Sequence, residues 1–126
     1  MERHLDSPVI LELCKNQYLL EKAREYLGES PFLWRSELWV NYPAKQLIPL
    51  WHQDHFFEVK SEIEKSALPV TLKPGEFIFF TDDLIHRSIC NISGKVRLSL
   101  TLRLAESTVK IQGSYSSHLQ SPILFL

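Results

Sequence analysis

The stretch from Lys95 to Leu104 alternates strictly between apolar and polar residues. Successive side chains of a β-strand point to opposite faces, so this alternation predicts a strand with one leucine-rich face and one polar face. Such a strand usually turns its polar face to water, but the face can instead line a polar pocket. The apolar positions are Val96, Leu98, Leu100, Leu102 and Leu104, and the polar positions are Arg97, Ser99, Thr101 and Arg103.

The rest of the chain predicts one helix followed by several short strands. Ser7 and Pro8 are typical of a helix start, apolar residues recur at helical spacing over Val9–Leu27, and Gly28 is a typical stop. Short strands after a single helix predict one domain, residues 1–126, built as a β-sandwich or barrel with a buttressing helix outside. The further strands are expected at Phe32–Tyr42, Leu47–Asp54, Leu68–Leu72, Glu76–Phe80 and Ile85–Cys90, with a turn at Lys73-Pro74-Gly75.

Composition narrows the function classes. With 126 residues, 44% apolar content and a formal net charge of −1, the chain has no electrostatic reason to bind nucleic acid or an anionic membrane surface. No apolar run reaches the roughly 20 residues that a membrane-spanning helix needs, and no secretory signal is recognisable. Cys14 and Cys90 form no CxxC pair and fit buried thiols in a reducing compartment. We therefore expect a soluble, cytoplasmic protein.

Candidate metal ligands begin with Trp51-His52-Gln53-Asp54. Residues two apart on an extended segment point to the same side, so His52 and Asp54 can present an imidazole and a carboxylate together. Trp51 itself is interpreted as part of the core or of a pocket wall. A metal site needs a third ligand, and the polar residues around His86 suggest where it lies.

A hairpin would bring that third ligand into a polar patch. If Ile85–Cys90 pairs with Lys95–Leu104 across the loop 91–94, His86 faces Ser99 and Ser88 faces Arg97. Two histidines and a carboxylate leave metal positions open, which suits iron(II) that binds a cosubstrate and oxygen together. An arginine can hold a carboxylate by two hydrogen bonds, as a dicarboxylate such as 2-oxoglutarate requires.

These motifs resemble the phytanoyl-CoA dioxygenase-like family over roughly Phe32 to Leu104. The resemblance rests on the HxD motif at 52–54, on Lys73-Pro74-Gly75-Glu76-Phe77, and on His86 followed eleven residues later by Arg97. It implies a mainly β fold, the double-stranded β-helix (a cupin-like jelly roll). It also implies an iron(II)- and 2-oxoglutarate-dependent dioxygenase that acts on a small organic substrate.

The resemblance also implies residue roles. His52, Asp54 and His86 would be the metal ligands and so the catalytic centre, and Arg97 would bind the far carboxylate of 2-oxoglutarate. Asp54 implies hydroxylation, with succinate and carbon dioxide released, because halogenating relatives carry a small residue there. Three further residues are expected around the cosubstrate: Ser88, Ser99 and Gln53.

One interval departs from the family pattern. Relatives usually carry a longer segment between the HxD motif and the Pro-Gly turn, whereas only Phe56–Val70 fills it here. The resemblance thus leaves room for a barrel that lacks part of its wall, with an exposed sheet edge through which two copies could pair as a homodimer. Two alternatives stay open: a catalytically impaired, metal-binding remnant of the same fold, and a cupin-like protein that uses another divalent metal.

Overall fold

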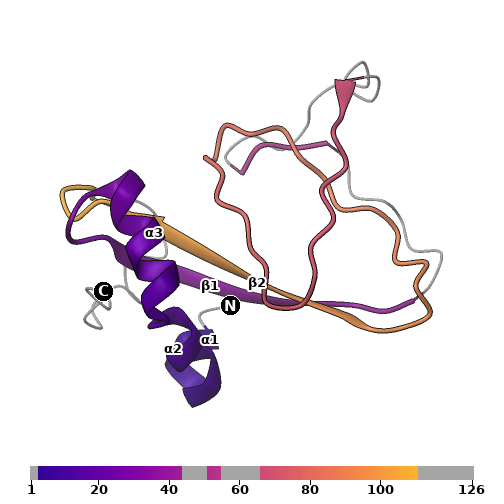
Figure 1. The fold of residues 1–126 in the computed structure, drawn as a ribbon, viewed down its shortest axis with the longest axis horizontal. Coiled ribbons are helices and arrows are strands. Elements are labelled where there is room, and N and C mark those ends of the chain that lie inside the picture. Colours follow the sequence, from indigo (N-terminus) through magenta and orange to yellow (C-terminus); the bar gives the residue numbers. More distant parts are fainter. Residues whose placement is uncertain (1–2, 44–50, 55–65, 111–126) are drawn as a thin grey trace. The chain divides into compact units, whose positions relative to one another are not determined.

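The computed structural model describes residues 3–43, 51–54 and 66–110 (Figure 1). Its contacts divide the chain into two compact units, Met1–Asn41 together with Arg97–Leu126, and Tyr42–Val96. All five named elements belong to the first unit: α1 (Arg3–Asp6), α2 (Pro8–Cys14), α3 (Gln17–Leu27), β1 (Phe32–Asn41) and β2 (Arg97–Ala105).

The predicted start at Ser7 and Pro8 and the predicted stop at Gly28 are confirmed, but α1 precedes this start and the region between is not one helix. Ser7 caps α2 by accepting a hydrogen bond from the Ile10 amide, and Gly28 ends α3 with a positive φ of 81°. The single helix expected over Val9–Leu27 is wrong, because Asn16 interrupts it. The Asn16 side chain accepts hydrogen bonds from the Tyr18 and Leu19 amides, at 3.1 and 3.3 Å. It therefore caps a new helix that starts at Gln17.

β1 and β2 form an antiparallel pair, shown side by side in Figure 1. Leu38 lies opposite Leu100, and Asn41 lies opposite Arg97. The register shifts between Leu33 and Arg35, so that one extra residue bulges from β1. The two strands that the sequence predicts most directly, at 32–42 and 95–104, are therefore confirmed within two residues at each end.

The leucine-rich face of β2 packs against α2. Three of its leucines contact a buried cluster that α2 and β1 supply, which confirms the alternation and a helix that buttresses the sheet. On the same face, fully buried Ser36 accepts a hydrogen bond from the backbone amide of His4 at 3.0 Å, and its hydroxyl lies 2.7 Å from Nδ1 of that histidine. The cluster consists of Ile10, Cys14 and Leu33, with Leu100, Leu102 and Leu104 against it.

The opposite face of the pair carries charged side chains. Glu37, only 8% exposed, forms an ion pair with Arg35 at 3.0 Å and lies 3.7 Å from Arg103. Arg103 also stacks on the ring of Trp34, 5.9 Å from its centroid. The polar face is thus largely covered at this end, whereas Arg97 and Ser99 at the other end of β2 are exposed.

In the second unit, the strands predicted at Leu68–Leu72, Glu76–Phe80 and Ile85–Cys90 are not formed as named strands. The turn between the first two is present, with a hydrogen bond from the Glu76 amide to the Lys73 carbonyl at 3.0 Å. Of the predicted segment Leu47–Asp54, residues 47–50 lie outside the described residues. An extended segment becomes a strand only when a partner satisfies its backbone groups, and the described residues offer these segments no continuous ladder.

The predicted hairpin between 85–90 and 95–104 would join segments of the two different units, and it stays a prediction. Ser99 pairs with Trp39 on β1, and His86 pairs with His52. At the loop, the Asn91 side chain donates to the Lys95 carbonyl at 2.7 Å and accepts from the Ser93 amide at 3.1 Å. These side-chain bonds close the loop 91–94 on itself.

The described residues therefore show helices packed on a two-stranded antiparallel sheet. The jelly roll and the missing part of its wall stay predictions. None of the helices in the described ranges is long and apolar enough to cross a membrane.

Replacing Leu33 with alanine tests the core. Leu33 is 1% exposed, so we expect Leu33→Ala to lower the free energy of unfolding by about 2–5 kcal/mol, as removal of a buried leucine side chain does. Leu98→Ala on β2 is the control, because Leu98 is 63% exposed and its loss should cost less than about 1 kcal/mol. Denaturant unfolding followed by circular dichroism measures both, and equal losses would contradict this placement of the core.

The two cysteines should differ in reactivity. Burial raises the pKa of the Cys14 thiol to about 11, whereas Cys90 is half-buried. The raised pKa means that Cys14 favours the folded state fully below pH 9, its ordinary value, and that this contribution is lost as pH rises toward 11. We expect a thiol reagent at pH 8 to label Cys90 first and Cys14 only upon unfolding. Labelling followed by mass spectrometry checks this, and faster modification of Cys14 would contradict it.

Candidate metal centre

The site begins with an isolated antiparallel bridge between His52 and His86 in the unit Tyr42–Val96. The His52 amide donates to the His86 carbonyl at 3.0 Å, and the His86 amide donates back at 2.9 Å. Directly opposed residues of an antiparallel pair point to the same face. The two imidazoles accordingly lie side by side, with ring centroids 4.4 Å apart.

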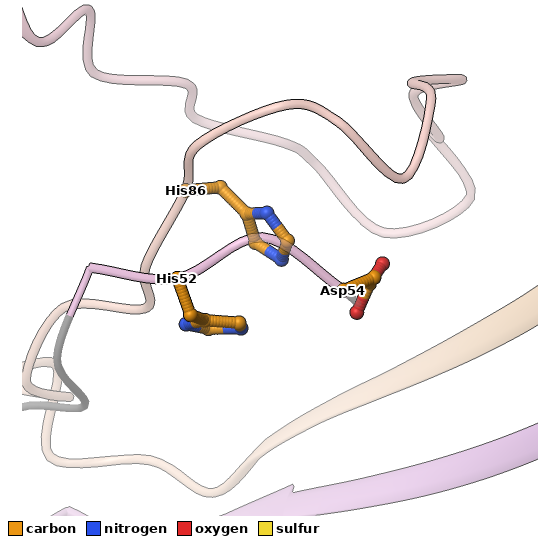
Figure 2. A group of neighbouring side chains, drawn as sticks. All are labelled: His52, Asp54 and His86. Carbon is orange, nitrogen blue, oxygen red and sulfur yellow. The ribbon is translucent and has the colours of Figure 1, made fainter. Parts of the chain in front are cut away.

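Asp54 completes a group of three possible metal ligands. Its amide donates to the Asp82 carbonyl at 3.1 Å, which anchors the end of the HxD segment. One ligand atom from each of Asp54, His52 and His86 lies within 4.8 Å of the other two, and all three residues are half-buried. Figure 2 shows the two imidazoles and the carboxylate reaching toward a common region from two segments.

Backbone and ring contacts orient His86. Its Nδ1 lies 2.8 Å from the Leu84 carbonyl oxygen. A carbonyl only accepts hydrogen bonds, so Nδ1 carries the proton and donates, which leaves the Nε2 lone pair for a metal. The Phe80 ring packs against the same imidazole at 4.9 Å between centroids. Neither contact was predicted: a carbonyl leaves no signal in the sequence, although Phe80 closes the apolar run after the Pro-Gly turn.

The face away from the imidazoles carries other contacts. The Arg87 guanidinium lies over the Trp51 indole, 4.6 Å from the ring centroid. The Gln53 side-chain amide donates to the Asp83 carbonyl, joining the HxD segment to the turn before His86. Trp51 is half-buried, as its interpretation as core or pocket wall requires.

The remaining predicted site residues are placed individually. Ser88 is exposed and lies in the same unit as the ligand group. Arg97 and Ser99 belong to the other unit, on β2, where both are exposed and two residues apart on one face. Their predicted neighbourhood with His86 stays a prediction. Across the β1–β2 pair, Arg97 faces Asn41 and Ser99 faces Trp39.

The ligand group fits a divalent transition metal. Two imidazole nitrogens and one carboxylate oxygen are the donors of the two-histidine, one-carboxylate sites that leave adjacent coordination positions open. Metal–ligand bonds of about 2.0–2.2 Å place two donors of one ion at most about 4.4 Å apart. Donor atoms within 4.8 Å of one another therefore need only small side-chain rotations to share an ion.

Comparison with known proteins agrees with this chemistry. The model of the phytanoyl-CoA dioxygenase (PhyH) family matches residues 36–99, half of the 126-residue chain. The matched region contains all three ligands, β1 from Ser36 onward, and β2 as far as Ser99. No curated protein and no solved structure matches the chain.

Removing the carboxylate ligand tests the centre. We expect Asp54→Asn to weaken cobalt(II) binding by the metal-free protein at least about 100-fold, because it removes a charged donor from a three-ligand group. The matched control is Asp83→Asn, which makes the same change at a residue outside the ligand group. The hydrogen bond from Gln53 is kept in this variant, because the backbone carbonyl of residue 83 accepts it. Titration followed by visible absorption measures both affinities. Equal affinities in the two variants would show that the ligand group is not the binding site.

Proposed function

The chain belongs to the phytanoyl-CoA dioxygenase family, and on that premise we propose that it is an iron(II)- and 2-oxoglutarate-dependent dioxygenase. The reaction proposed is hydroxylation of a small organic substrate, with 2-oxoglutarate converted to succinate and carbon dioxide. The observation that carries the proposal is the group of His52, Asp54 and His86, whose donor atoms lie within 4.8 Å of one another.

The three ligands would hold iron(II) and leave adjacent positions open for cosubstrate and oxygen. The bound metal would supply the activation of oxygen, which no side chain can perform. The protein's own share is orientation. The His52–His86 bridge keeps both imidazoles on one face, and the Leu84 carbonyl holds the proton of His86 on Nδ1.

We assign the far carboxylate of 2-oxoglutarate to Arg97. A guanidinium stays charged at any physiological pH and can donate two parallel hydrogen bonds to a carboxylate. Exposed Ser99 lies on the same face of β2 and would add a hydroxyl donor. Ser88 and Gln53 are assigned to the surroundings of the same cosubstrate. The Gln53 side chain donates a hydrogen bond to the Asp83 carbonyl and so ties the HxD segment to the 82–84 turn. This contact favours an indirect role for Gln53, through that turn.

The proposed function includes the jelly-roll fold and a single domain over residues 1–126. The family match supports this, because the matched residues 36–99 include parts of both compact units. Pairing of two copies through a sheet edge is part of the same proposal. A mixing experiment with a tagged and an untagged copy would detect it.

A second candidate is a metal-binding remnant of the same fold that does not turn over. The observation that favours it is the exposure of the apolar run Phe77–Phe80, whose residues are each 37–47% exposed and whose last ring packs against His86. An oxygenase pocket excludes water from its reacting centre, and such exposure is unusual for a closed pocket.

Cosubstrate turnover separates the two candidates. We expect the wild-type protein with iron(II) and 2-oxoglutarate to form succinate, and His52→Ala to abolish its formation, because the variant lacks a metal ligand. Anaerobic addition of 2-oxoglutarate to the iron-loaded protein should also produce a charge-transfer absorption. Absorption without succinate across a panel of candidate substrates would favour the remnant, and full turnover by His52→Ala would refute both.

Arg97 has its own test. We expect Arg97→Gln to raise the 2-oxoglutarate concentration at half-maximal absorption at least about 10-fold, since it removes a charge-assisted pair of hydrogen bonds. Lys95→Gln removes an equal charge from an exposed residue two positions earlier and serves as the control. A similar rise in both variants would mean that Arg97 acts only through general charge.

A further inference from the structure

The stacked pair of Trp51 and Arg87 flanks both histidine ligands. Trp51 directly precedes His52, and Arg87 directly follows His86. The guanidinium carbon lies 4.6 Å from the centroid of the indole, well within the distance at which a cation is attracted to an aromatic face. Neither side chain is among the possible metal ligands.

The register explains why these two side chains meet. His52 and His86 are directly opposed in an antiparallel bridge, so the residue before one lies opposite the residue after the other. Neighbouring residues on extended backbone point to opposite faces. The Trp51–Arg87 pair therefore occupies the face of the bridge that lies away from the two imidazoles.

The bridge needs support because its ladder is short. Two backbone hydrogen bonds join His52 to His86, and continuation of the register would pair Asp54 with Leu84. Instead Asp54 donates to Asp82, and the Leu84 amide turns back to Thr81 at 3.0 Å. On this side the ladder is interrupted, while on the other side the stacked pair continues it by side-chain contact.

A slip of this register would remove the metal centre. Shifting one segment by a single residue moves all its side chains to the other face. A shift that brought Arg87 opposite His52 would turn the His86 imidazole to the other face. The Arg87 side chain would then lie beside His52 in its place. The stack of Trp51 on Arg87 is formed only in the register that places both imidazoles together.

The indole is held by its ring and not by its N–H group. Trp51 Nε1 is buried and has no hydrogen-bond partner among the described residues. The contribution of this side chain to the site is accordingly the aromatic face that receives Arg87. Phenylalanine keeps such a face and loses only a donor that has no partner among the described residues, which makes it the conservative replacement.

We propose that Trp51 and Arg87 are a positioning pair for the metal centre: stacked on the reverse face of the bridge, they hold His52 and His86 in the register that lets them share an ion. The inference rests on the metal binding within the proposed function and does not require turnover. It assigns no contact with substrate or cosubstrate to either residue.

Charge and positioning predict opposite effects of removing Arg87. A cation close to the site repels a second cation, so on electrostatic grounds alone Arg87→Leu would tighten metal binding. As a positioning residue, Arg87 favours the ligand geometry, and its loss weakens binding. Trp51→Leu carries no charge change and isolates positioning from electrostatics.

The test is a cobalt(II) titration of the metal-free protein, read by visible absorption bands that report coordination geometry. We expect Trp51→Leu and Arg87→Leu each to weaken binding about 10- to 100-fold and to alter these bands. Trp51→Phe and Arg87→Lys, which keep the ring face and the charge, should stay within about 5-fold of wild type. The double leucine variant should be no weaker than the weaker single variant, because the two side chains act through one contact.

Circular dichroism of the metal-free variants separates positioning from loss of fold. If a leucine variant fails to fold, Trp51→Phe is compared with Trp51→Met instead. Methionine removes the aromatic face but leaves a flexible apolar side chain that adapts to the space. Three results would each contradict the positioning role of Trp51 and Arg87. They are unchanged cobalt affinity and absorption bands in the folded variants, tighter binding by Arg87→Leu, and additive losses of affinity in the double variant. Absence of cobalt binding by the wild type would instead remove the proposed function, and this inference with it.

Discussion

Two reciprocal backbone hydrogen bonds between His52 and His86 are the contact on which the candidate metal centre depends. They join segments that lie far apart in sequence and make these two residues direct opposites, so that both imidazoles share a face. Other contacts then refine the arrangement. The Leu84 carbonyl sets the protonated nitrogen of His86, and Phe80 packs against its ring. A bridge of two hydrogen bonds can support a site because these further contacts fix the orientation of the His86 ring.

The β1–β2 pair depends on a different interaction, the burial of one leucine-rich face. Leu33 and Cys14 are each 1% exposed, and leucines of β2 cover them. Burial of apolar surface is non-directional, so it accounts for the association of the helices with the sheet but not for the register. Directional contacts supply the register: the strand ladder itself and the Ser36 hydroxyl, which receives the His4 amide.

Local signals predicted the elements of this chain well. The strict alternation of 95–104 identified β2 and its buried face, and the spacing of His52 and Asp54 identified two residues that share a side. Where two local signals compete, prediction was less accurate. Asn16 lies within a helical pattern, yet its side chain caps the following turn and splits the helix.

Partner choice was only partly predictable. Proximity in sequence favours a hairpin between 85–90 and 95–104, because a short loop costs little entropy to close; that hairpin stays a prediction. The structure pairs β2 with β1, which allows the leucine face to be buried, and pairs His86 with His52. Neither pairing was predicted, whereas His86 does lie beside the HxD motif as expected.

The sequence by itself determined the chemistry of this protein: which donors are available, which residues alternate to one face, and where turns and caps interrupt the chain. Those properties reside in single side chains and their spacing, so they can be read without coordinates. The tertiary structure decided which segments pair, and so which face of His86 meets His52 and which side chains stack behind them. Pairing depends on the sum of many contacts between distant residues, and the backbone carbonyls that complete the site are the same in every residue type.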